Sequence, residues 1–324
     1  MNCKSNRRQI LKISTGAAAL ALTGMAWPSE EAIRIVVPFP AGGGADQVAR
    51  LLAVPLAKRL SSPVWIENLP GGDGAVAANH VAKASPNGKT LLMATYGAIS
   101  ALPHIRPSLP YMPESDFTVL SHMGQFSMML FGSARTGLHN FKDFEIHCQH
   151  DPQAFNCGTG NVASMVMGAW LGRHWNVDLH QVPYKGEVPA MIDLVSDRIQ
   201  MMFATPTNAL GFVRERKLLA LAHVGATRNP LAPEAPSWKE LRLEPFAAQP
   251  WGGIMGPVGI NSKLIHQYHQ AINDCIMHEP VMVAEMQKNG FVPHVSFLDQ
   301  LPGWLSTQSK EWQAAIRESG IAKV

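Results

Sequence analysis

Near the start of the chain, the pattern of apolar residues changes from that of a buried strand to that of a helix within a short distance. Ile33–Val37 form a run rich in β-branched apolar side chains, which is typical of a buried strand. Pro38–Gly44 follow as a Pro/Gly-rich segment. From Ala45 onward the apolar residues recur at helical spacing, with Val48 and Leu52 on one face. The sequence therefore predicts a strand, a glycine loop and a helix in direct succession.

The same alternation of strand and helix patterns extends through most of the chain. Further strands are predicted at residues 64–67, 90–94, 118–120, 181–184, 199–203 and 218–223. Further helices are predicted at residues 75–83, 163–175, 189–194, 207–216, 262–278 and 281–290, and within 298–316. Residues 251–259 are predicted to be a Gly/Pro loop. This order of elements predicts an α/β fold with mainly parallel pairing, and residues 128–247 form a second α/β block.

Composition adds a bound on size and on partners. The chain has 324 residues with 46% hydrophobic and 16% charged content, enough for two ordinary domains with a substantial core. Residues 1–26 carry Lys4, Arg7, Arg8 and Lys12 and no acid. Without these four charges the formal charge of +3 becomes −1. We therefore expect no nucleic-acid partner.

The first 26 residues have the pattern of an export signal. A charged segment precedes the apolar stretch 13–25, which is short for a membrane span, and small residues precede a cleavage point after Ala26. Arg7 and Arg8, followed by Gln-Ile-Leu-Lys, resemble the twin-arginine signal, although an ordinary Sec signal stays open. The rest of the chain has no apolar stretch of about 18 residues. We expect an exported, periplasmic protein from which residues 1–26 are removed.

Three cysteines remain after that cleavage. Cys148 and Cys157 are near enough in sequence to pair in an oxidising compartment, and Cys275 would then be left over. Sequence spacing does not show whether the two side chains meet. The pairing of Cys148 with Cys157 is therefore left open.

Two glycine loops are candidates for ligand contact. Gly42, Gly43 and Gly44 precede a helix, so backbone N–H groups and the positive end of the helix dipole suit a carboxylate or a phosphate. A second loop, Gly158–Asn161, precedes the helix pattern of the second α/β block. Clefts between domains are frequent small-molecule sites. We expect the two loops to face each other across such a cleft.

Other motifs are weaker. Gly72–Ala77 has the outline G-x-G-x-x-A of a dinucleotide site, but no acid follows the next strand at residues 90–94. His147, Cys148 and His150 have no second ligand pair nearby, so we expect no metal. The chain has neither a G-x-S-x-G elbow nor an obvious carboxylate pair. We therefore expect a protein that is not an enzyme and needs no cofactor.

Several segments, in order along the chain, resemble one family. Ile35–Asp46 (IVVPFPAGGGAD) opens the series. The others are Glu67–Gly72, Pro86–Leu92, Val182–Gly186, Lys217–Ala222, Trp251–Gly253 and Gly256-Pro257. Together they resemble the Bug/TctC family, the extracytoplasmic solute-binding receptors of tripartite tricarboxylate transporters, over about residues 32–320.

The resemblance implies a type II periplasmic-binding-protein fold, in which two α/β lobes close on a ligand like a clam shell. Lobe one would be residues 27–127 plus 248–324, and lobe two would be residues 128–247. The implied function is capture of a small organic carboxylate for the membrane permease subunits of the transporter, by a monomer. A ligand sensor that passes its closed state to a membrane signalling protein is the alternative.

The resemblance also implies the positions that surround the ligand. The loop Phe39–Gly43 would bind the proximal carboxylate, and Asp46 would order that loop without touching the ligand. The residues implied for the site are Phe39, Pro40, Ala41, Gly42, Gly43, Asp46, Thr95, Gly97, Thr159, Gly160, Ala163, Ser164, Ala204 and Thr205.

This chain departs from the family pattern in lobe two. Val162, Ala163 and Val166 replace a Gly, a Ser and a His, and Ala204 stands where the family commonly has Asp. In relatives that bind amino acids, that Asp can meet an ammonium group. The departure predicts a carboxylate ligand with an apolar or aromatic distal part and argues against a zwitterion.

Overall fold

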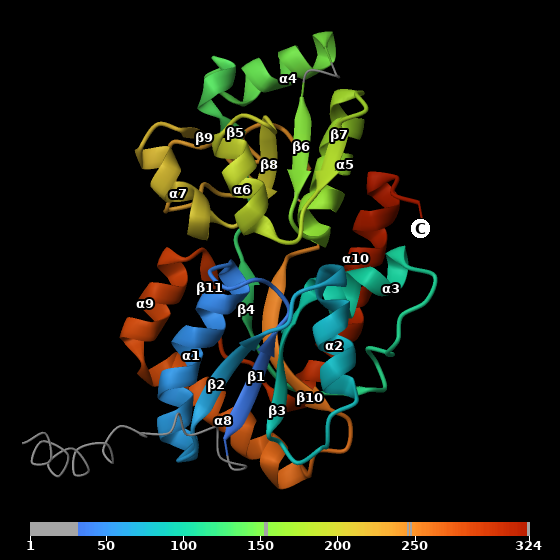
Figure 1. Cartoon of the computed structure of the whole chain (residues 1–324), viewed down its shortest axis with the longest axis vertical. Helices are drawn as coiled ribbons and strands as arrows, with labels where there is room; N and C mark the ends of the chain where they lie inside the picture. Colours follow the sequence, from blue (N-terminus) through green and yellow to red (C-terminus); the bar gives the residue numbers. More distant parts are fainter. Residues whose placement is uncertain (1–31, 152–154, 245, 247, 323–324) are drawn as a thin grey trace, which may run out of the picture. The chain divides into compact units, whose positions relative to one another are not determined.

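The computed structural model of the chain describes residues 32–151, 155–244, 246 and 248–322. The predicted export signal at residues 1–26 lies outside the described residues. Ala32–Val324 form one compact unit, and its described part contains two β-sheets covered by helices (Figure 1).

The first sheet has six strands in the order β11-β4-β10-β3-β1-β2. Strands β2, β1 and β3 pair in parallel, as the βαβαβ pattern predicts. β10 is antiparallel to β3 and β4, and β11 is antiparallel to β4. The strands are β1 Ile33–Val37, β2 Val64–Asn68, β3 Thr90–Thr95, β4 Phe117–Phe126, β10 Trp251–Pro257 and β11 Phe291–Pro293.

The second sheet has five strands in the order β7-β6-β8-β5-β9. β6 pairs in parallel with β7 and β8, whereas β5 is antiparallel to β8 and β9. The strands are β5 Met129–Ser133, β6 Asn156–Thr159, β7 His180–Pro183, β8 Met201–Ala204 and β9 Leu218–His223.

The prediction of a loop at residues 251–259 is wrong, because Trp251–Pro257 is strand β10 in the middle of the first sheet. All seven of its residues are buried. Its glycines suggested a turn, but here they allow close approach of neighbouring strands. A Cβ atom on Gly253 would collide with the carbonyl oxygen of Ser121 on β4.

Alternating side chains attach helices to both faces of the first sheet. Ile35 and Val37 pack with α1, α8 and α9 on one face, and Val36 packs with α2 on the other. The C-terminal helix α10 lies on the same side as α2. The helices and helical turns of this part are α1 Gly44–Leu60, η1 Gly72–Gly74, α2 Ala75–Ala82, η2 Gly97–Ala101, α3 Leu102–Ile105, α8 Ser262–His278, α9 Pro280–Lys288, η5 Leu298–Gln300 and α10 Leu301–Ser319.

The second sheet is covered in the same way. Met129 and Phe131 of β5 pack with α6 and α7, whereas Leu130 packs with α4 and α5 on the opposite face. The helices and helical turns are η3 Ala134–Thr136, α4 Phe141–His150, α5 Val162–Trp175, α6 Glu187–Val195 and α7 Pro206–Arg214. Helix α4 occupies a segment whose polar composition gave no helix prediction, and Asn140 caps it by accepting a bond from the Asp143 N–H.

The two sheets are connected by two chain segments, which cross between the sheets next to each other. β4 continues into β5 through Ser127 and Met128, and residues 224–250 lead from β9 back to β10. The Phe126 N–H donates to the Pro250 carbonyl at 2.7 Å, and the Val224 N–H donates to the Met128 carbonyl at 3.1 Å. Helix α10 also bridges the two parts by packing on both η2 and α5.

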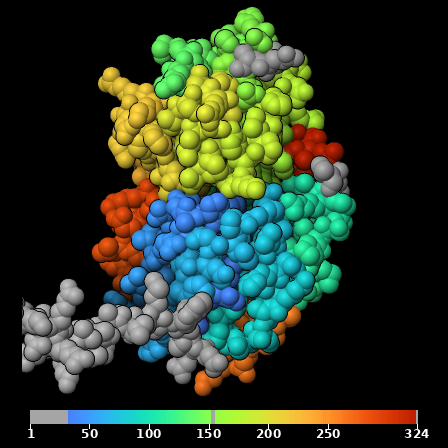
Figure 2. Space-filling view, viewed as in Figure 1, coloured from blue at the N-terminus to red at the C-terminus, as the bar shows by residue number. Residues whose placement is uncertain are grey.

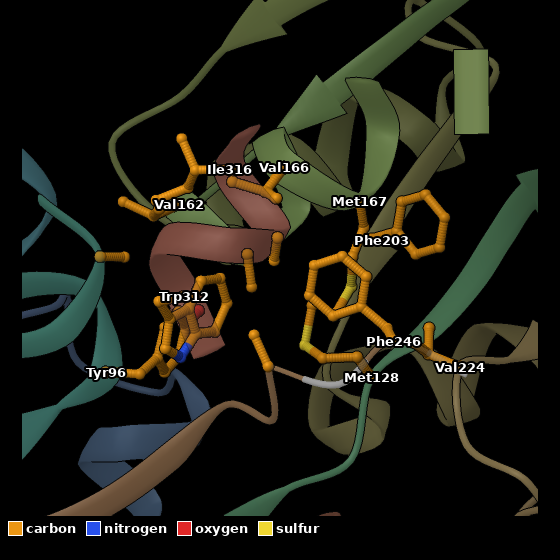
Figure 3. Packing of buried hydrophobic residues seen from close by; sticks show 14 of the residues in the cluster. Tyr96, Met128, Val162, Val166, Met167, Phe203, Val224, Phe246, Trp312 and Ile316 are labelled. Carbon is orange, nitrogen blue, oxygen red and sulfur yellow. The ribbon is translucent and has the colours of Figure 1, made fainter. Parts of the chain in front are cut away.

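A continuous apolar cluster marks this bridge. Trp312 of α10 stacks on Tyr96 with ring centroids 4.7 Å apart, and Ile316 lies near Val162 and Val166 of α5 (Figure 3). The two sheets therefore share part of one hydrophobic core, and they are not linked by the crossing strands alone.

The cysteine and metal predictions can be compared directly with the structure. Cys148, Cys157 and Cys275 are buried free thiols, so the pairing left open by the sequence is not formed. Burial raises the pKa of Cys148 and of Cys157 to about 12. Among the residues that the structure describes, no group of three or more His, Cys, Asp or Glu side chains could hold a metal ion. None of the described helices is long and apolar enough to cross a membrane.

Candidate functional site

A small cavity lies where parallel strands of both sheets end, next to the last residues of β1, β3, β6 and β8. This edge is where open α/β sheets usually bind ligands. The cavity volume is about 40 Å³, against the roughly 10–15 Å³ that one water molecule needs. Figure 2 shows the surfaces of the two parts meeting along a narrow seam. The lining residues are Phe39, Pro40, Gly43, Gly44, Ala45, Thr95, Tyr96, Phe126, Met128, Gly160, Asn161, Glu187, Val188, Thr205 and Pro250.

The wall that belongs to the first sheet contains hydrogen-bond donors without partners among the described residues. Helix α1 begins at Gly44, and its N-cap Gly43 has no side chain to satisfy the first-turn N–H groups. The N–H groups of Gly44 and Ala45 have no acceptor among the described residues, and both residues line the cavity. The positive end of the α1 dipole lies at the same point. This wall is thus suited to an anion.

Asp46 holds the glycine loop in place from behind. Its carboxylate accepts bonds from the Gly42 N–H at 2.8 Å, from Arg50 Nε at 2.9 Å and from Asn68 Nδ2 at 2.9 Å. Asn68 also donates to the Phe39 carbonyl at 3.0 Å. Burial raises the pKa of Asp46, but the bonds from Arg50, Gly42 and Asn68 outweigh burial and lower it overall. The ionised carboxylate therefore fixes both ends of the loop.

Thr95 supplies a side-chain donor to the same wall. It ends β3, is only 1% exposed and lines the cavity. Its Oγ1 is buried and has no hydrogen-bond partner among the described residues. A buried hydroxyl without a partner is costly, and a ligand oxygen in the cavity would satisfy it.

On the opposite wall, backbone N–H groups at the N-terminus of helix α5 already donate hydrogen bonds to side chains at the same helix terminus. The Ser164 Oγ accepts bonds from the N–H groups of Gly160 at 3.0 Å and Asn161 at 3.1 Å, and Asn161 Oδ1 accepts from the Ser164 N–H at 2.9 Å. This is a complete capping box. Burial raises the pKa of the Tyr96 hydroxyl well above its usual range. The second glycine loop therefore offers few free donors to an anion.

Glu187 is the acidic group of the cavity. It opens helix α6 and lines the cavity beside Thr205 and Asn161. Its Oε2 accepts bonds from Thr205 Oγ1 at 2.6 Å and the Thr205 N–H at 3.1 Å, and its Oε1 accepts from Asn161 Nδ2 at 2.8 Å. Burial raises the pKa of Glu187 despite these three bonds. Within the described residues Glu187 makes no ion pair, and the lining contains no Lys, Arg or His.

Some of the site residues predicted from the sequence line this cavity, and the others lie outside its lining. Those that line it are Phe39, Pro40, Gly43, Thr95, Gly160 and Thr205. Those outside the lining are Ala41, Gly42, Asp46, Gly97, Thr159, Ala163, Ser164 and Ala204. Gly42, Asp46 and Ser164 shape the two loops from behind, through the bonds described above.

Several lining residues were missed by the sequence reasoning. They are Ala45, Tyr96, Phe126, Met128, Glu187, Val188 and Pro250, whereas the lining residues Gly44 and Asn161 belong to the two glycine loops that the sequence already indicated. Phe126, Met128 and Pro250 belong to the crossing segments and carry no local signal. A signal for Glu187 did exist, because it follows the family-like segment Val182–Gly186 directly. However, an acidic residue in the first turn of a helix is already explained by its favourable interaction with the helix dipole, so the sequence alone does not indicate a ligand contact.

The prediction of an apolar distal wall rested on a premise that the structure overturns. That prediction gives the wall no acid, because Ala204 stands where the family commonly has Asp. Glu187, from a different element, instead places a carboxylate next to Thr205, the residue that follows Ala204.

Comparisons with known proteins place this chain and its fold among solute receptors. The model of the tripartite tricarboxylate transporter family receptors matches residues 48–321. The chain is 28% identical over 318 residues to protein BugT of Bordetella pertussis, covering 95% of each chain. The structure of the periplasmic binding protein BugD superimposes with a TM-score of 0.85 at 25% identity, covering 92% of this chain and 100% of BugD. MatC of Rhodopseudomonas palustris with bound malate gives a TM-score of 0.80 at 26% identity, covering 88% of this chain and 98% of MatC.

Proposed function

Because the chain belongs to the family of tripartite tricarboxylate transporter receptors, we propose that its cavity captures a small organic carboxylate for delivery to membrane permease subunits. The family consists of solute-binding receptors and not of enzymes. Its two-lobed fold is that of periplasmic binding proteins. The proposal concerns the ligand class, the site and the partner.

One observation carries the ligand class. The uncapped start of α1 and the unpartnered Thr95 Oγ1 present donors to the same cavity, and both lack acceptors among the described residues. A carboxylate has two oxygens that accept such bonds. The malate bound to MatC, a protein 26% identical to this chain, supports the same class of ligand.

We further propose that residues 27–127 with 248–324 and residues 128–247 act as two lobes that open about the crossing segments. Each sheet draws its strands from one of these sets. The hinge would lie at Ser127 and Met128 and at Pro250, where the two crossings are hydrogen-bonded side by side. Ligand entry requires opening, because the cavity of about 40 Å³ holds only a few water-sized groups.

The cellular part of the proposal follows the family. We propose that residues 1–26 direct export to the periplasm and are removed there, and that the mature receptor works as a monomer. Mass spectrometry of protein purified from the periplasm tests the first point, because cleavage after Ala26 gives a chain that begins at Trp27.

Carboxylate binding is tested on the purified mature protein by native mass spectrometry, followed by thermal unfolding with a matched panel at millimolar concentration. The panel is propionate, succinate, malate, alanine and β-alanine, with propionamide as the uncharged control. At least one carboxylate is expected to raise Tm, since a ligand at a hundred times its Kd adds about 2.7 kcal/mol to the free energy of unfolding. Equal effects of propionamide and propionate, or no effect of any acid, would overturn the proposal.

A further inference from the structure

Glu187 provides the cavity with carboxylate oxygens, which accept hydrogen bonds, whereas the wall at the start of α1 provides donors. We propose that Glu187 selects ligands carrying a protonated amine a short distance from their carboxylate, so that the receptor prefers a small amino acid to the corresponding simple acid. This inference rests on the proposed function, because it assumes that the carboxylate binds at the start of α1.

The hydrogen bonds of Glu187 favour its ionised form. Three donors, from Asn161 and from the side chain and backbone of Thr205, point at the two carboxylate oxygens at 2.6–3.1 Å. Hydrogen bonds donated to a carboxylate stabilise the charged form. Oε1 accepts only one of the three bonds, so it keeps acceptor capacity for a further donor.

The charge of Glu187 has no counter-charge. No lysine, arginine or histidine among the described residues pairs with it, and the cations of the chain are absent from the lining. Charges removed from water are normally paired, since an unpaired one is strongly unfavourable. Burial accordingly raises the pKa of Glu187. A ligand ammonium group would supply the missing charge and up to three N–H donors.

The surroundings of Glu187 suit a cation. Phe39, Tyr96 and Phe126 line the same small cavity. Large aromatic side chains exclude water, which strengthens the pairing of a cation with the carboxylate. Three N–H donors at the α5 N-terminus, which would have served a second anion, are already bound by Ser164 Oγ and Asn161 Oδ1.

The distance between the two walls limits the ligand to a short one. A Cβ atom on Gly44 would lie 3.3 Å from Thr205 Oγ1, and that oxygen is 2.6 Å from Glu187 Oε2. The donor wall and the acid therefore approach each other closely. A carboxylate and an amine separated by one or two carbons fit this arrangement better than long dicarboxylates do.

The competing assignment is a protonated Glu187 that donates its proton to the second carboxylate of a diacid. Binding of matched ligands to the mature protein, measured by calorimetry at pH 7, separates the two. Alanine and β-alanine each add one ammonium group to propionate, and succinate adds a carboxylate. We expect alanine or β-alanine to bind about tenfold to a hundredfold more tightly than propionate.

Two variants connect that preference to Glu187. Glu187→Gln removes the charge and is expected to bring the ratio of amino acid to propionate affinity close to one. Glu187→Asp keeps the charge but shortens its reach, so an intermediate ratio is expected. Glu234→Gln is the control, because Glu234 is exposed and outside the cavity, and its ratio should equal that of the unmodified protein. Thermal unfolding of each variant verifies folding.

The possible outcomes separate this inference from the proposed function. Tighter binding of succinate or propionate than of both amino acids would overturn the role of Glu187 and leave carboxylate capture intact. An amine preference that survives Glu187→Gln would also overturn it. Failure of every acid in the panel to bind would instead overturn the proposed function.

Discussion

Gly44 faces Thr205 directly across the cavity, where a Cβ atom on Gly44 would lie 3.3 Å from Thr205 Oγ1 and 3.6 Å from Phe126 Cδ1. We expect Gly44→Ala to weaken carboxylate binding several-fold, because the added methyl group narrows the gap in which a ligand must fit. Stability of the free protein should change by less than about 1 kcal/mol, because the helix preference of alanine is offset by the tight contact of its methyl group with Thr205 Oγ1. Calorimetry with a carboxylate of the panel and urea unfolding measure the two effects.

Gly303→Ala is the matched control for that substitution. Gly303 lies in helix α10, is exposed, and has open space around an added Cβ atom. It should gain helix stability without any change in affinity. Equal affinities of Gly44→Ala and the unmodified protein would show that the carboxylate does not enter between Gly44 and Thr205.

Thr95→Val should separate ligand binding from stability. The Thr95 hydroxyl is buried and has no partner in the described part of the chain, so its replacement by a methyl group should not lower the free energy of unfolding. If the hydroxyl donates to the ligand carboxylate, affinity should fall by about 1.5–3 kcal/mol. Thr118→Val on β4, outside the cavity, is the control and should change neither affinity nor the response to ligand. A stability loss in Thr95→Val without loss of affinity would contradict the assignment.

Asp46→Asn should destabilise the glycine loop in a pH-dependent manner. The folded pKa of Asp46 is lowered from 3.8, so its carboxylate contributes stability at pH values above about 4, and that contribution is lost as the pH falls through the folded pKa. We expect the variant to lose about 1–3 kcal/mol at pH 7, and this difference to shrink as the pH falls below 3.8 and through the lowered folded pKa. Urea unfolding from pH 2 to pH 7 measures this, with Asp178→Asn, at an exposed position between α5 and β7, as control. A difference that does not depend on pH would refute the ionic role.

The alternating pattern of residues 33–95 predicted β1, α1, β2, α2 and β3 because each element there is local. Its apolar period, its glycine loop and its helix start all lie within a few residues of one another. Strand β10 was not predictable in this way. Its three glycines read as a turn, and only the closely packed neighbours on β3 and β4 make them necessary.

The candidate site shows the same contrast between residues with a local sequence signal and residues whose role depends on distant parts of the chain. Gly43 could be placed from sequence because it lies between a predicted strand and a predicted helix, whereas Phe39 and Thr95 were implied by the resemblance to the Bug/TctC family. Glu187 could not, because its role depends on Thr205 and Asn161, which lie 18 and 26 positions away from it in the chain. The capping box of Asn161 and Ser164 had a local signature, yet a sequence pattern does not show whether a helix start is available to a ligand or satisfied by its own side chains.

The neighbouring side chains of His122 and His294 are expected to make the stability of the protein sensitive to acid. His122 Nδ1 and His294 Nε2 are 2.9 Å apart, and the His122 ring stacks on Trp304 with centroids 3.9 Å apart. Burial, followed by the proximity of His294, lowers the pKa of His122 to about 3. An imidazole whose folded pKa is lowered contributes stability above its unfolded pKa of 6.5, and that stability is lost as the pH falls below 6.5.

We therefore expect the free energy of unfolding to fall by up to about 2 kcal/mol between pH 6.5 and pH 5 through His122 alone. His122→Phe keeps an aromatic ring against Trp304 but cannot bind a proton, so its unfolding free energy should fall less over this range. His278→Phe, at an exposed end of α8, should retain the full dependence. Equal slopes for the two variants would mean that His122 is not the group through which acid destabilises the sheet.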